Sequence, residues 1–252
     1  MDHLSSLNPQ QLQAVTAGPG PVLVLAGPGS GKTRVLTQRI AYLIGSQGVR
    51  PYHILAVTFT NKAAREMEER VGQFVGSQTQ GLTLGTFHAT CARILRREAE
   101  FLPFNSNYVI FDSDDQISVV KRALSDLNID NKRYSPQSVL GTISRAKNEL
   151  LLPDEFVPQN YRDEVVKRVF SRYQELLLVS NALDFDDLLL WTARLLEDEQ
   201  VVRQKYGQRF QYVLVDEFQD TNLAQYRLLN HLASVHKNLF VVGDADQSIY
   251  AW

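Results

Sequence analysis

One eight-residue segment limits the possible folds of this chain more than any other. Residues 26–33 read AGPGSGKT, and they stand between an apolar run of strand length and a stretch of helical periodicity. Glycines at this spacing let backbone amides approach an anion, and a helix start adds the positive end of its dipole. A strand, this loop and a helix together predict a loop that binds the phosphates of a nucleotide.

The residues of this loop have separate expected roles. Its backbone amides surround phosphate oxygens, the Lys32 side chain brings a positive charge to the outer phosphates, and the Thr33 hydroxyl is a ligand for Mg²⁺. We therefore expect the nucleotide to be bound by the whole loop: Ala26, Gly27, Pro28, Gly29, Ser30, Gly31, Lys32 and Thr33.

Apolar runs of strand length recur along the chain, at residues 22–26, 54–58, 82–86, 212–216 and 239–243. These runs are apolar throughout rather than alternating, which is typical of parallel strands buried on both faces. Helical patterns lie between the first strands. The sequence therefore predicts an α/β fold, with a parallel sheet flanked by helices.

The strand–helix alternation stops between about residues 104 and 183. That stretch shows helical periodicity only, and its connections contain helix breakers. We therefore expect an α/β domain formed by residues 1–103 and 184–252, with an all-helical subdomain inserted at residues 104–183.

A second polar cluster follows the fourth apolar run. Asp216 and Glu217 stand at the end of a buried strand. Burial of a carboxylate is energetically unfavourable unless the carboxylate binds a cation or takes part in catalysis. We expect Asp216 to hold Mg²⁺ through water and Glu217 to accept the proton of an attacking water. A third polar segment, residues 243–247, follows the last run. Because parallel strands end at one edge of a sheet, the three clusters predict a single active site there.

Composition narrows the class of protein further. Of the 252 residues, 44% are hydrophobic and 21% are charged, as in an ordinary globular protein. The net charge of −2 means that any nucleic-acid binding must rest on local features. The single cysteine, Cys91, excludes an intramolecular disulfide. Neither a secretory signal nor an apolar stretch of membrane-spanning length is evident, so we expect a soluble cytoplasmic protein.

Successive motifs of this chain resemble those of UvrD/PcrA/Rep-type superfamily 1 DNA helicases, in family order. They are LNPQQ at 7–11, GKTR at 31–34, TFTNKAA at 58–64, TFH at 86–88, LDFDD at 183–187, DEFQDT at 216–221 and GDADQSIYAW at 243–252. The resemblance covers the whole chain. It implies a RecA-like P-loop NTPase fold, ATP and Mg²⁺ as cofactors, and single-stranded DNA as a partner.

The resemblance also assigns roles that the residue chemistry leaves open. Gln11 matches the glutamine that reads the adenine edge, and Arg34 is expected beside the base. Gln247 matches the residue that senses the terminal phosphate and couples it to DNA. The expected catalytic residues are then Lys32, Asp216, Glu217 and Gln247.

Two segments and two aromatic residues match positions that contact DNA in the family: Phe59, Thr60 and Asn61; Thr86, Phe87 and His88; Tyr250 and Trp252. Aromatic rings stack on bases without sequence preference, and Trp252 matches a stacking platform. From the residues alone, simpler interpretations stay open: core packing for Phe59 and Trp252, a capping or hydrogen-bonded role for His88, and a helix start for Asn61.

Two acidic clusters are interpreted as helix starts rather than cation sites. Residues 112–115 precede Ile117, and residues 184–187 precede Leu188. The first cluster lacks the later ligands of a calcium loop, and carboxylates favour helix N-termini.

The last motif reaches Trp252, and family members continue with an arginine and a second RecA-like domain that supplies arginine fingers. We therefore expect an amino-terminal, monomeric portion of a 3′–5′ single-strand translocase. We expect it to bind ATP weakly, to hydrolyse ATP slowly or not at all, and not to unwind duplex DNA. Two alternatives stay open: a subunit of a RecB/AddA-type helicase–nuclease, and a non-motor module that binds nucleotide or protein.

Overall fold

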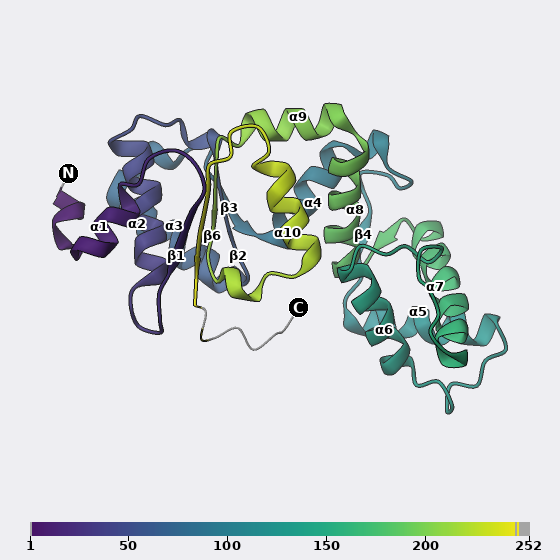
Figure 1. Ribbon diagram of the computed structural model, residues 1–252. Coiled ribbons are helices and arrows are strands. Elements are labelled where there is room, and N and C mark those ends of the chain that lie inside the picture. The colour runs from purple at the N-terminus through teal and green to yellow at the C-terminus, as the bar shows by residue number, and fades with distance from the viewer. Residues whose placement is uncertain (1, 245, 247–252) are drawn as a thin grey trace. The chain divides into compact units, whose positions relative to one another are not determined.

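The computed structural model describes residues 2–244 and 246, which group into two compact units (Figure 1). The first unit consists of Met1–Thr90, Gln200–Thr221 and Gln225–Trp252. The second unit consists of Cys91–Glu199 and Asn222–Ala224. The predicted helical segment, residues 104–183, lies inside the second unit, which also takes in residues 91–103 and 184–199. No helix among the described residues has both the length and the apolar composition to cross a membrane.

The described part of the first unit contains a five-stranded parallel sheet in the order β1-β7-β6-β2-β3. Its strands are β1 (Val22–Leu25), β2 (Ile54–Thr58), β3 (Thr83–Thr86), β6 (Tyr212–Val215) and β7 (Leu239–Gly243). This confirms the predicted RecA-like α/β fold. In the register of the sheet, Leu25 is opposite Gly243 and Thr58 is opposite Thr86. The carboxyl ends of the strands therefore line up at one edge.

Helices flank this sheet. They are α1 (Pro9–Val15), α2 (Lys32–Gly45), α3 (Asn61–Val75) and α9 (Gln200–Arg209), while α4 (Phe87–Arg97) and α10 (Leu223–Leu232) run across the division between the units. Figure 1 shows α2 and α3 on one side of the sheet and α10 on the other. Val35, Leu36 and Ile40 recur at helical spacing, so they lie on one face of α2. In the hydrophobic core this face packs against buried residues of β2, β6 and β7.

Strand β1 differs from the prediction that all strands are buried on both faces. Strand β2 is buried along its whole length. In β1, by contrast, Val22 and Val24 pack against the core, while Leu23 and Leu25 are 59% and 64% exposed. The described residues cover only one face of β1, whereas β3, the other outer strand of the described sheet, is mostly buried.

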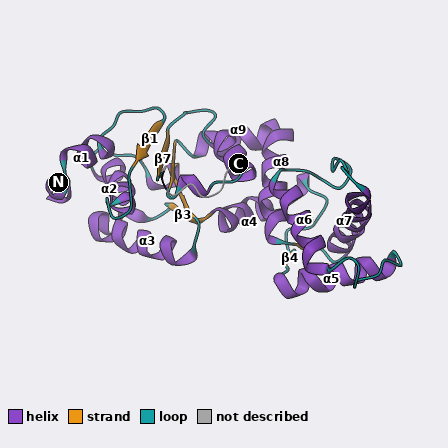
Figure 2. Cartoon of the chain, turned by 60° about the horizontal axis from the view of Figure 1, so that its bottom comes forward, coloured by secondary structure: helices purple, strands orange, loops and turns teal. Residues whose placement is uncertain are grey.

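Helices dominate the second unit (Figure 2). They are α5 (Ser113–Asp126), α6 (Pro136–Asn148), α7 (Tyr161–Val179) and α8 (Phe185–Asp198). The segment predicted to hold helices only also contains a short parallel pair, β4 (Val109–Ile110) and β5 (Ala182–Leu183). Strands of two residues are too short to show a strand periodicity in the sequence.

Both acidic clusters are helix starts, as predicted. Asp112 caps α5 and Asp184 caps α8, each through a reciprocal capping box with the residue three positions later, Asp115 and Asp187.

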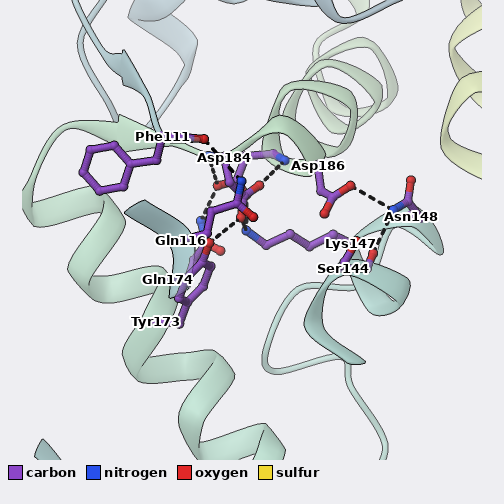
Figure 3. Close-up of polar contacts among 10 residues, drawn as sticks. Phe111, Gln116, Ser144, Lys147, Asn148, Tyr173, Gln174, Asp184 and Asp186 are labelled. Atoms are coloured by element: carbon purple, nitrogen blue, oxygen red, sulfur yellow. Dashed lines mark hydrogen bonds and ion pairs between the residues drawn. The ribbon is translucent and has the colours of Figure 1, made fainter. Parts of the chain in front are cut away.

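A buried ion cluster connects the helices of the second unit (Figure 3). Lys147 is 1% exposed, and its Nζ lies 2.7 Å from Asp184 and 2.8 Å from Asp187. The Tyr173 hydroxyl donates to Asp184 over 2.8 Å. Burial alone would lower the pKa of Lys147, but the two carboxylates together raise it. The end of α6 is thereby fixed to the start of α8.

Candidate nucleotide-binding site

The loop between β1 and α2 has the backbone of an anion-binding turn. Gly29 and Gly31 adopt φ angles of +72° and +90°, a region that residues with side chains rarely enter. The Ser30 hydroxyl donates to the Gly27 carbonyl over 2.6 Å, and the Ala26 amide donates to the Gly243 carbonyl over 3.0 Å. Residues 27–30 are exposed at the N-terminus of α2. The first turn of α2 and the loop thus offer amides to an anion.

The Lys32 side chain is held within the site. It is 9% exposed, and its Nζ donates to the Ala26 carbonyl and to Asp244 Oδ2, each over 3.2 Å. The ammonium group therefore lies between the start of the loop and the end of β7.

The two expected Mg²⁺ ligands are adjacent. Thr33 Oγ1 donates to Asp216 Oδ2 over 3.1 Å, and Asp216 is 2% exposed. Burial raises the pKa of Asp216, and the neighbouring Glu217 carboxylate raises it further. Mg²⁺ prefers oxygen ligands, and a cation would offset the cost of this buried carboxylate. The residues present therefore fit a magnesium ion.

Glu217 has a strained backbone and a fixed side chain. Its φ angle is +51°, which is uncommon for a residue with a side chain. The side-chain amide of Gln219 donates to Glu217 Oε2 over 2.8 Å. The side-chain oxygen of Gln219 accepts a hydrogen bond from the Asp244 backbone amide over 3.0 Å. A Cβ added at Gly243 would lie 3.1 Å from Gln219 Oε1. One glutamine therefore connects the segment after β6 to the segment after β7.

The sequence predicts no separate role for Gln219 or Asp244, although both stand in the polar segments that follow buried strands. Their roles depend on contacts between the two segments, and the sequence pattern contains no signal for those contacts.

The expected base-binding residues lie near the C-terminal end of the loop, where Gln11 contacts Ser30 and Arg34 directly follows Thr33. The Gln11 amide donates to the Ser30 carbonyl over 2.9 Å, and Gln11 also completes a capping box with Asn8 at the start of α1. Arg34 donates to the carbonyl and the hydroxyl of Ser6, over 2.9 and 2.7 Å. The structure thus brings Gln11 to the loop. Gln247, Tyr250 and Trp252 lie outside the described residues.

The two segments expected to contact DNA lie next to each other at the ends of β2 and β3. The rings of Phe59 and Phe87 meet edge to face, with centroids 5.6 Å apart. Phe59 is half-buried, while Phe87 is 3% exposed and belongs to the core.

The polar members of these segments also have structural roles. Thr60 caps α3 and accepts from the Ala63 amide over 3.1 Å, so that Asn61 is the first residue of that helix. Thr86 Oγ1 accepts from the Ala89 amide over 3.2 Å. Burial lowers the pKa of His88. Thr60 and Asn61 are the exposed residues of the first segment.

The fold and the site together define a P-loop nucleotide-binding domain of the RecA-like class. The family model of the UvrD/REP helicase N-terminal domain matches residues 7–252, and the chain belongs to this family. It is 52% identical over 251 residues to the ATP-dependent DNA helicase PcrA of Bacillus subtilis (strain 168). It is 50% identical to PcrA of Staphylococcus aureus (strain Mu50) and 48% identical to PcrA of Staphylococcus epidermidis. Each alignment covers 99% of this chain and 34% of the relative, so the chain spans about a third of the length of these relatives.

Proposed function

We propose that this chain is the ATP- and single-strand-binding portion of an ATP-dependent DNA helicase motor that moves 3′ to 5′. One observation carries the nucleotide-binding part of this proposal: Thr33 Oγ1 lies 3.1 Å from Asp216 at the carboxyl edge of the sheet, and Lys32 lies beside them, 3.2 Å from Asp244. The relatives at about 50% identity are named ATP-dependent DNA helicases, which supports ATP as the nucleotide.

The proposed chemistry divides among the residues of the site. The loop amides and Lys32 bind the phosphates, and Thr33 and Asp216 would hold Mg²⁺. A bound Mg²⁺ supplies charge neutralisation at the transferring phosphate. Glu217, held by Gln219, orients the attacking water and accepts its proton.

The nucleotide base and the terminal phosphate are assigned to two glutamines. We propose that Gln11 reads the adenine edge, with Arg34 beside the base. The hydrogen bond from the Gln11 side chain to the Ser30 carbonyl, over 2.9 Å, supports this role because it keeps Gln11 next to the phosphate loop. Gln247 is proposed to sense the terminal phosphate.

Single-stranded DNA is proposed to cross the ends of β2 and β3. The proposed contacts are Phe59, Thr60, Asn61, Thr86, Phe87 and His88, together with Tyr250 and Trp252. The adjacency of Phe59 and Phe87 supports a common surface for the two segments. Because the net charge is −2, binding is expected to depend on stacking and local contacts rather than on a general positive field.

We also propose which part of the motor this chain forms. Residues 104–183 form a helical insert in the motor domain, and the working protein is a cytoplasmic monomer with a second RecA-like domain. Residues 1–252 alone are proposed to bind ATP weakly and to turn it over slowly or not at all. The reason is that the family resemblance assigns the arginine fingers to the second domain, and these groups accelerate phosphoryl transfer by about a thousandfold or more.

Single-turnover hydrolysis of radiolabelled ATP, with and without an oligothymidine strand, tests this proposal. Fluorescence anisotropy of the labelled strand measures DNA binding in the same samples. We expect binding of single strands in preference to duplex, and little hydrolysis. Rapid hydrolysis stimulated by DNA would overturn the proposed impairment, and absence of any single-strand binding would contradict the DNA-binding role.

A further inference from the structure

The partner of Lys32 in this structure is a carboxylate of the segment that follows β7. Lys32 Nζ and Asp244 Oδ2 are 3.2 Å apart, and the two side chains are 9% and 2% exposed. Asp216, the expected Mg²⁺ ligand, is instead bonded to Thr33. The cation expected to bind phosphate is therefore already paired with a buried anion.

The Asp244 carboxylate is held firmly in this position. The Asp246 amide donates to its Oδ1 over 3.1 Å, and Lys32 binds its Oδ2. Its own amide donates to Gln219 over 3.0 Å, and the preceding residue, Gly243, accepts from the Ala26 amide. Asp244 is thereby fixed both to the phosphate loop and to the segment after β6.

A buried ion pair of this kind has a consequence for ligand binding. Separation of the pair leaves a buried charge without its partner, which is strongly unfavourable unless another charge takes its place. A phosphate oxygen bound by Lys32 would have the same charge sign and the same hydrogen-bonding capacity as the Asp244 carboxylate. Phosphate and carboxylate thus compete for one ammonium group.

We propose that Asp244 is an affinity-determining residue of the nucleotide site: its carboxylate holds Lys32 until the outer phosphates of a nucleotide displace it. This inference rests on the proposed function, that residues 26–33 bind the phosphates of ATP. Asp244 lowers the affinity for every ligand that recruits Lys32, and it keeps the buried ammonium group paired when no nucleotide is present.

Titration with a fluorescent ATP analogue carrying a methylanthraniloyl group, in the presence of Mg²⁺, tests the inference. The variant is Asp244→Asn, which keeps the shape and an acceptor for the Asp246 amide but removes the charge. The control is Asp246→Asn, which removes an exposed charge two residues away and leaves the backbone contact in place. We expect Asp244→Asn to bind the analogue about tenfold more tightly, and Asp246→Asn to change the affinity less than about twofold.

Thermal unfolding of the same proteins gives a second readout. Without nucleotide, Asp244→Asn is expected to melt at a lower temperature than the wild type, because Lys32 is left unpaired. The rise in melting temperature on addition of the analogue is expected to be larger than in the wild type. If Asp244→Asn does not fold, Asp244→Ser replaces it with the same expectations.

Two results would overturn the inference: equal or weaker binding by Asp244→Asn, or equal tightening by Asp246→Asn, which would indicate a general charge effect. Failure of the proposed function is distinguishable, because the wild type itself would then not bind the analogue.

Discussion

The Thr33 hydroxyl donates a hydrogen bond to Asp216 Oδ2 over 3.1 Å, and this contact joins the start of α2 to the end of β6. The two residues are 183 positions apart in the chain. They approach each other because parallel strands end at the same edge of the sheet. Their oxygens form the part of the site that fits Mg²⁺.

Replacement of Asp216 should remove the magnesium dependence of nucleotide binding. For Asp216→Asn we expect a loss of about tenfold in affinity with Mg²⁺ present and little change with a chelator, because one anionic ligand is lost. The measurement is titration of the fluorescent ATP analogue in both conditions. Thr33→Ser keeps the hydroxyl and is the control. Unchanged Mg²⁺ dependence in Asp216→Asn would place the ion elsewhere.

A side chain at Gly243 should destabilise the protein. A Cβ at this position would lie 3.1 Å from Gln219 Oε1 and 3.4 Å from its backbone nitrogen. We expect Gly243→Ala to lower the free energy of unfolding by about 1–3 kcal/mol, through displacement of the segment after β6. Urea denaturation measures the change.

Gly72→Ala is the matched control for this substitution. Gly72 lies within α3, and a Cβ there meets nothing within 4 Å. Alanine is expected to raise the free energy of unfolding by about 0.5–1 kcal/mol at such a helical position. Equal effects of the two substitutions would show that the contact with Gln219 does not constrain Gly243.

The stability of the second unit should depend on pH through Asp187. Burial and then the neighbouring Asp184 carboxylate raise the pKa of this carboxyl, Lys147 lowers it, and the net result is a rise from 3.8 to about 7. Between these two pH values the folded protein binds more protons than the unfolded chain. The free energy of unfolding should therefore fall as the pH rises from about 4 to about 7. The surrounding groups are Lys147 on α6, Tyr173 and Gln174 on α7, Asp184 at the N-cap of α8 and Asp186 in its first turn.

Urea denaturation at pH 5 and at pH 8 measures this dependence. In Asp187→Asn the fall with rising pH should be smaller than in the wild type. Asp114→Asn, an exposed substitution near the start of α5, should keep the wild-type dependence. A pH dependence that is the same in all three proteins would rule out Asp187 as its source.

Removal of Lys147 should destabilise the second unit strongly. Lys147→Met leaves the Asp184 and Asp187 carboxylates buried without their cation, so we expect a loss of about 3–5 kcal/mol in the free energy of unfolding. Lys121→Met, at an exposed position of α5, should change it by less than about 0.5 kcal/mol. Comparable losses in both variants would contradict the role of the buried cluster.

Much of the α/β architecture could be predicted because its strands are buried. The run at residues 54–58 is apolar and coincides with β2, which is buried on both faces. The exposure of Leu23 and Leu25 could not be predicted, because it depends on which strands and helices cover β1. The β4–β5 pair was missed because two residues carry no periodicity.

The candidate site also contains some residues that the sequence predicts and others that it does not. The loop could be identified because glycines before a lysine, between a strand and a helix, are typical of a phosphate-binding loop. Asp216 could be identified because a carboxylate after a buried strand is unfavourable without a functional role. The partner of Lys32 could not be identified. Its pairing with Asp244 depends on the register that puts Leu25 opposite Gly243, and an apolar pattern does not specify which strands are neighbours.

Nucleotide binding by the wild type and by Lys32→Ala shows whether residues 26–33 form a phosphate site. The fluorescent ATP analogue is titrated with Mg²⁺ into both proteins and into Lys62→Ala, whose side chain is 87% exposed and pairs only loosely with Glu66 at 4.0 Å. We expect saturable binding by the wild type and by Lys62→Ala, and a loss of about tenfold or more in the affinity of Lys32→Ala. Equal binding by the wild type and Lys32→Ala, or no binding by the wild type, would contradict this expectation.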